Sequence, residues 1–126
     1  MHLLLYIVVL LLLLPFSANA EDIQAWTGTD TALELTYQVL RLVDRNQTLE
    51  IAKHPETRTE GCIFLDEHPS TSEVNQYMAL LSISHALISY ALPKPYRTAW
   101  QAVTIIDVGT AVNHNRQAGL AISFSF

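Results

Sequence analysis

Three helix-like segments of the sequence each place one ionisable side chain among apolar residues. Asp44 lies in the first segment, with Thr48 one turn further along, while His85 and Asp107 lie in the second and third. A buried carboxylate without a partner costs free energy, so it must pair with another group, bind a metal or keep its proton. If the three apolar stripes converge in one core, we expect His85 to be the partner that makes the two acids tolerable.

Three kinds of chemistry fit these residue types. The favoured interpretation is a structural polar network in which Asp44, Thr48, His85 and Asp107 hydrogen bond and fix how the helices pack. The second is a divalent-metal site, with Asp44, Glu60, His85 and Asp107 as its ligands. Further imidazole donors for such a site are His54, His68 and His114. The third is an acid/base centre built from the same buried groups.

Motifs that would favour catalysis do not occur in the sequence. No two histidines have the i, i+4 spacing of a zinc-protease helix, and there is no serine nucleophile motif, glycine-rich phosphate loop or Cys-x-x-Cys pair. We therefore assign no catalytic residue and expect no cofactor other than the alternative metal. An enzyme is the less favoured interpretation.

The elements that must position these residues are helices. Helical spacing of apolar residues predicts a first helix over 31–53, with Thr31 and Glu34 spaced as a capping box. A second capping box, Ser70 to Glu73, predicts a helix over about 71–92, and a third helix is expected over about 96–112. On the first helix, the polar face opposite the apolar stripe is expected to carry Glu34, Gln38, Arg41 and Arg45.

These elements predict an all-α fold. We expect a small three-helix domain after an amino-terminal segment, with a structured connector over 54–70 and a short extended tail, LAISFSF, at the carboxyl end. The second and third helices carry many small residues, as helices in membrane bundles do. Their internal polar groups and the shortness of the third make neither a clear membrane span.

The first 20 residues, MHLLLYIVVLLLLLPFSANA, have the order of a secretory signal peptide. An apolar run is followed by Pro15 and by a small-x-small pattern, which places cleavage between Ala20 and Glu21. Only His2 and the amino terminus supply positive charge before the run, so a retained signal anchor is the alternative. We expect an exported protein, periplasmic or membrane-associated, with one domain over 21–126.

Charge and cysteine content limit the kinds of binding partner that we expect. The formal net charge of the 126-residue chain is -5 and no basic stripe occurs, so nucleic acid, whose phosphates need Lys and Arg, is not expected as a partner. Cys62 is the one cysteine, which excludes a disulfide within the chain. A membrane or an envelope protein remains as the expected partner.

Several short stretches together resemble a family of small proteins encoded in proteobacterial genomes and prophages. They are Asp44-x-x-Gln47-Thr48, AKHPE at 52–56, Glu60, EHPS at 67–70, SYALP at 89–93, RTAW at 97–100, and Asn115-Arg116 with Gly119. Related sequences read Glu-x-Asn-Pro-Ile-Leu-Gly before His-Pro-Ser, and Cys62, Ile63 and Asp66 depart from that pattern. The departure puts in doubt any site that the connector forms in the family. The resemblance implies a bacterial envelope or phage-linked origin and no mechanism.

The leading functional hypothesis is an exported or membrane-associated accessory protein that acts through contacts and not through catalysis. One alternative is a metal-binding protein or small hydrolase that uses Asp44, His85 and Asp107. The other is a small multi-pass membrane protein that retains residues 1–20 as an anchor.

Overall fold

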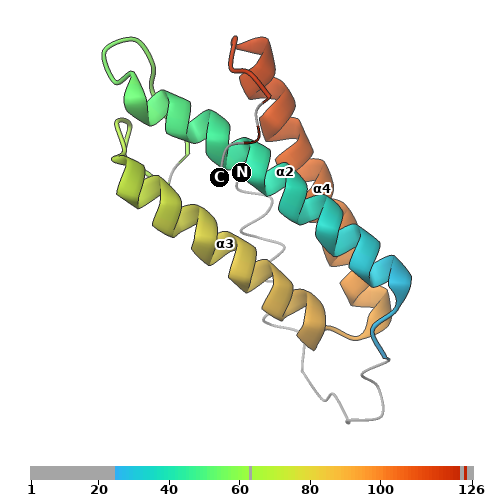
Figure 1. The fold of residues 1–126 in the computed structure, drawn as a ribbon. Coiled ribbons are helices and arrows are strands. Elements are labelled where there is room, and N and C mark those ends of the chain that lie inside the picture. The colour runs from blue at the N-terminus through green and yellow to red at the C-terminus, as the bar shows by residue number, and fades with distance from the viewer. Residues whose placement is uncertain (1–24, 63, 123, 125–126) are drawn as a thin grey trace.

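The computed structural model describes residues 25–62, 64–122 and 124. Within them the chain forms three helices, α2 (Gly28–Lys53), α3 (Thr71–Ala91) and α4 (Lys94–Gln117), and no strand (Figure 1). The expected all-α fold with three helices is thus confirmed. The signal segment 1–20 and its cleavage site lie outside the described residues.

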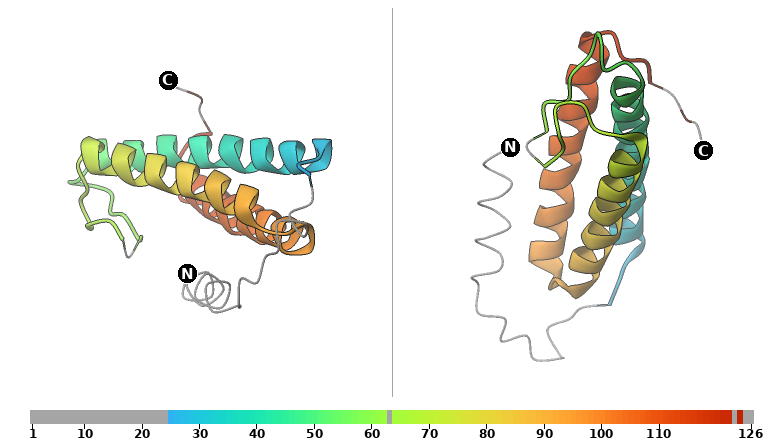
Figure 2. Two further views of the ribbon diagram at one scale, coloured as in Figure 1. Left: turned by 90° about the horizontal axis from the view of Figure 1, so that it is seen from below. Right: turned by 90° about the vertical axis from the view of Figure 1, so that its left-hand side faces the viewer.

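The three helices run side by side as one up-down-up bundle (Figure 2). α2 packs against both other helices, whereas α3 and α4 contact each other least. Two sides of α2 are therefore covered, and its side chains meet neighbours over more of its circumference than one apolar stripe would require. This explains why the face expected to be polar and solvated is half-buried at Glu34, Gln38, Arg41 and Arg45.

Side-chain caps fix where α2 and α3 begin. The Ser70–Glu73 capping box is confirmed, with the Ser70 amide donating to the Glu73 carboxylate at 2.7 Å. The first box was expected one turn too late. Thr27 caps α2 in place of Thr31, and its amide donates to the Asp30 carboxylate at 2.8 Å. Glu34 is not available for capping because it contacts His85 on α3.

α4 is longer at both ends than the sequence pattern predicts. Pro95 lies in its first turn, where a missing amide hydrogen costs nothing, so the prolines at 93 and 95 start the helix instead of delaying it. The turn-rich residues 113–117 are helical. The helix ends at Gln117, and the chain turns away at Gly119, whose φ of 88° suits glycine and whose amide donates to the Arg116 carbonyl at 3.0 Å.

The core of the described residues is unusually polar. Ten apolar side chains are buried in it, among them Tyr37, Val74, Met78 and Trp100. Ten polar or charged side chains are buried as well: Asp30, Asp44, Asn46, Gln47, Thr48, His85, Ser89, Arg97, Gln101 and Thr104. Buried polar groups need hydrogen-bond partners, so the packing of the helices depends on how these groups pair.

None of the helices in the described ranges combines the length and the apolar character needed to cross a membrane. The described residues that follow α4 have no regular structure beyond the turn at Ala118 and Gly119. Leu120 is buried against the bundle, and the described part of the tail contains no strand.

The position of the first cap is testable. Replacing Thr27 by Ala removes the side chain that accepts from the Asp30 amide, and we expect the free energy of unfolding in urea to fall by about 1 kcal/mol. Thr31→Ala is the matched control, because Thr31 is exposed and its side chain bonds, within the described part of the chain, to Trp26 and the Thr27 carbonyl alone. A larger loss of unfolding free energy in the Thr31 variant would show that Thr31 caps the helix, as predicted from the sequence.

Candidate functional site

The imidazole of His85 lies at the centre of the bundle and bonds to both neighbouring helices. Its Nδ1 is 3.0 Å from the carboxylate of Glu34 on α2, and its Nε2 is 2.8 Å from the hydroxyl of Thr104 on α4. The side chain of His85 is only 2% exposed. One residue thus connects all three helices.

Two aromatic rings enclose this imidazole. The ring of Tyr37 lies parallel to it, with centroids 3.5 Å apart and planes at 10°. The ring of Trp100 stacks on it at 5.3 Å. The rings exclude water from His85 and leave its two nitrogens pointing at Glu34 and Thr104, so the polar contacts are made in an apolar slot.

Burial lowers the pKa of His85, although the hydrogen bond and the charge of Glu34 act in the opposite direction. Burial would raise the pKa of Glu34, but hydrogen bonds from Gln38 and His85 outweigh it and hold that pKa below its usual value. At neutral pH the pair is therefore a carboxylate and a neutral imidazole. The carboxylate needs a donor, so a proton lies on Nδ1 of His85, while Nε2 lies 2.8 Å from the Thr104 hydroxyl.

A second layer of polar side chains holds Glu34 in place. Gln38 donates to it at 2.8 Å, and Gln101 on α4 donates to it at 3.4 Å. Gln101 also donates to the carbonyl of Asp30 at 3.1 Å. Both amide side chains are thereby fixed in orientation, and the Glu34 carboxylate is surrounded by donors.

The network ends in a buried ion pair between Asp30 on α2 and Arg97 on α4. Their charged atoms are 3.2 Å apart and both side chains are 1% exposed. Nε of Arg97 also donates to the carbonyl of Ser89 on α3 at 2.9 Å. Burial would raise the pKa of Asp30, but hydrogen bonds from Thr27 and the charge of Arg97 lower it, so the carboxylate stays ionised.

His85 and Asp44, which were expected to meet, belong to two separate polar clusters. His85 is buried as expected, but its acidic partner is Glu34 and not Asp44. Asp44 pairs with Arg41 at 2.8 Å, and burial raises its pKa. Thr48 is buried one turn further along α2.

Asp107 is exposed, contrary to the expectation that it lies in the core. The buried side of α4 follows Arg97, Gln101, Thr104 and Val108, and Asp107 lies at its edge. Burial is the main cause that raises the pKa of Asp44, and the charge of Asp107 adds to this rise. The charge and the hydrogen bond of Arg41 act in the opposite direction. The expected convergence of Asp107 with His85 in one core is therefore not seen in the structure.

The described residues contain no group of three or more His, Cys, Asp or Glu side chains close enough to hold a metal ion. Burial raises the pKa of Glu60, and the charge of Asp44 raises it further, so these two carboxylates are close enough to interact. Asp107 and His85 do not join them in a metal site within the described residues. His54, His68 and His114 are exposed.

The order carboxylate, imidazole and hydroxyl also occurs in hydrolytic triads. Here the Thr104 hydroxyl is in a residue only 4% exposed and already lies 2.8 Å from the Trp100 carbonyl. A substrate could reach it only if the helices separated. The arrangement of Glu34, His85 and Thr104 therefore fixes helix positions and does not present a nucleophile.

Sequence reasoning missed most of this network because it assigned one apolar stripe to each helix. The signal was present in two rows of polar residues at helical spacing, Asp30 with Glu34 and Arg97 with Gln101 and Thr104. Such rows place several polar groups on one helix face. Opposite charges in the two rows indicated that they could pair.

Comparisons with protein-family models, with curated proteins and with solved structures found no match to this chain. The resemblance to a proteobacterial and prophage family therefore stays a prediction. The class of protein that fold and site define is a three-helix domain held by a buried histidine network.

Removing the imidazole tests whether it connects the bundle. We expect His85→Ala to lower the free energy of unfolding by about 3 kcal/mol, because Glu34 and Thr104 lose their shared partner inside the fold. His54→Ala is the matched control, since His54 is exposed and its ion-pair partners among the described residues are Glu50 and Glu56. Equal urea midpoints for wild type and the His85 variant would show that the network does not stabilise the fold.

The lowered pKa of His85 also predicts a pH dependence. Below the ordinary pKa of 6.5 the unfolded chain binds the His85 proton more readily than the folded chain does. The free energy of unfolding therefore decreases as the pH is lowered, by at most about 1.4 kcal/mol per pH unit. The window of pH 7 to 5 lies above the ordinary pKa of 4.5 for Glu34. We expect this part of the slope to disappear in His85→Gln, measured by urea unfolding at several pH values. Identical slopes would contradict a buried neutral imidazole.

Proposed function

We propose that this protein is an exported accessory protein of the cell envelope, periplasmic or membrane-associated, that acts by binding a protein partner through α3. The observation that carries the proposal is a row of four large apolar side chains on the outer side of this helix. Leu80, Ile83, Leu87 and Tyr90 are 60–69% exposed. We call these four residues the α3 stripe.

The α3 stripe lies directly opposite the core. His85 and Ser89, on the inner side of the same helix, are buried. Residues 74–93 contain no Asp, Glu, Lys or Arg, so the outer side of α3 has no charges to keep it in water. A helix that is apolar on two sides is typical of one covered on both.

The spacing of the α3 stripe suits a helical partner. Its members follow one another at intervals of three, four and three residues, as at the seam of a coiled coil. Small residues flank the stripe at Ala79, Ser84, Ala86 and Ala91, which permits close approach of a second helix. On α4, Tyr96 and Ile106 are exposed as well.

A protein partner fits this surface better than a lipid headgroup layer does. Helices that lie in a membrane interface combine an apolar face with a polar face rich in Lys and Arg. α3 has no basic residue beside its apolar stripe, and its other side is committed to the core. The signal peptide predicted from the order of residues 1–20 supports an envelope location for the partner.

A charge placed in the α3 stripe should abolish binding without unfolding the domain. We expect Leu87→Glu to lower the amount of protein that sediments with native envelope membranes at least tenfold, because the carboxylate would be buried unpaired in the interface. Leu35→Glu is the matched control: Leu35 is 60% exposed and lies on α2. Thermal unfolding of both variants verifies that they are folded.

Vesicles made from the extracted envelope lipids separate the two kinds of partner. Wild type that binds native membranes and not these vesicles supports a protein partner. Equal binding to both, or equal loss in the Leu35 and Leu87 variants, would overturn the proposal.

A further inference from the structure

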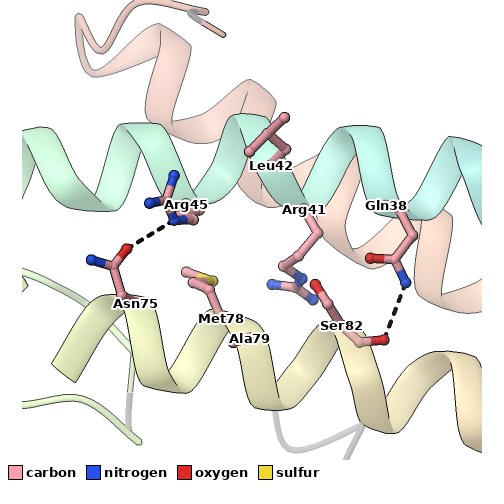
Figure 3. A pocket seen from close by; sticks show the side chains of 8 residues that line it. All are labelled: Gln38, Arg41, Leu42, Arg45, Asn75, Met78, Ala79 and Ser82. Atoms are coloured by element: carbon pink, nitrogen blue, oxygen red, sulfur yellow. Dashed lines mark hydrogen bonds between the residues drawn. The ribbon is translucent and has the colours of Figure 1, made fainter. Parts of the chain in front are cut away.

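A groove of about 470 Å³ runs between α2 and α3 on the side of α3 that faces α2. It is lined by polar side chains of both helices, Gln38, Arg41, Arg45, Asn75 and Ser82, with Met78 in its middle (Figure 3). The groove shares Gln38 with the His85 network, and none of the four residues of the α3 stripe lines it. Two of the seven basic residues of an acidic chain line it.

Arg45 is the arginine in this groove whose charge is not neutralised. Its Nε donates to the Asn75 side-chain oxygen at 2.9 Å, and its Nη1 donates to the Asn46 side-chain oxygen at 3.2 Å. Both partners are uncharged amides. By contrast, Arg41 pairs with Asp44 and Arg97 pairs with Asp30. Within the described ranges, Arg45 forms no salt bridge and its Nη2 forms no hydrogen bond.

The two amides hold the guanidinium of Arg45 in one orientation, as Figure 3 shows for Asn75. A guanidinium that is already oriented loses less conformational freedom when it binds a second group. Arg41 lies one turn before Arg45 on the same side of α2, and its charge is shared with one carboxylate only. The groove therefore retains about one positive charge in a protein of net charge -5.

We propose that this groove binds the carboxylate or phosphate group of a small organic anion. The free edge of Arg45 forms charge-assisted hydrogen bonds to the anionic oxygens, the geometry in which arginine binds such groups best. The apolar part of the ligand lies along Met78 and Leu42, which also line the groove. Gln38 and Ser82 are joined across one end by a hydrogen bond of 3.1 Å, which limits the length of the bound group.

The test uses the full chain labelled with ¹⁵N, and follows the Nε–H signal of Arg45 and the side-chain amide signal of Asn75. The probes are octanoate, octyl phosphate, inorganic phosphate and the uncharged octyl glucoside. We expect both signals to shift saturably with octanoate and octyl phosphate and not with octyl glucoside. If inorganic phosphate saturates the shifts as well as octyl phosphate does, the site takes a free anion; if only the octyl compounds do, it takes an amphiphile.

Variants assign the binding to Arg45. We expect Arg45→Gln to weaken binding at least tenfold, and Arg45→Lys to weaken it also, because lysine keeps the charge without the two-pronged donor geometry. Lys53→Gln is the matched control, since it removes one charge from an exposed position of the same helix. If Arg45→Gln does not fold, Arg45→Lys and the wild-type titration still test the proposal. Absence of saturable shifts in wild type, or equal weakening in the Lys53 and Arg45 variants, would overturn the proposal.

Discussion

The hydrogen bonds of one buried imidazole set the positions of all three helices. His85 can satisfy both ring nitrogens only if Glu34 of α2 and Thr104 of α4 lie on opposite sides of it. A slip of either helix by one turn, about 5.4 Å, would leave a carboxylate and an imidazole buried without partners. Apolar side chains alone would tolerate such slips more easily, because contacts between them are not directional. The polar network therefore specifies one packing arrangement.

The ion pair at the other end of this network follows from the same constraint. Removing Asp30 and Arg97 from water costs several kcal/mol for each ion, and their attraction recovers it only when geometry and further hydrogen bonds are favourable. Thr27 supplies two bonds to Asp30, and the Ser89 carbonyl accepts one from Arg97. The capping residue of α2 thus also completes the ion pair, so the start of one helix and its packing on α4 depend on each other.

How much could be predicted from the sequence depended on whether a feature is local. Three helices, the Ser70 cap and the burial of Asp44, Thr48 and His85 follow from spacing within a single segment. The partner of His85 and the exposure of Asp107 depend on how far each helix is rotated about its axis, which a single stripe cannot fix when α2 is covered on two sides. Glu34 illustrates this: a residue expected in solvent is the one that meets the buried imidazole.

The distribution of polar and apolar groups in α3 connects the core to the proposed function. Its inner side contributes His85 and Ser89 to a polar core, while Leu80, Ile83, Leu87 and Tyr90 remain in water. Full burial of a large apolar side chain contributes roughly 1.5–3 kcal/mol, so covering the α3 stripe stabilises the fold by an amount comparable to several core residues. By linkage, a partner that binds only the folded chain raises its stability. The polar core fixes the shape of the domain, and the proposed helical partner would realise the apolar free energy that the exposed side of α3 leaves unused.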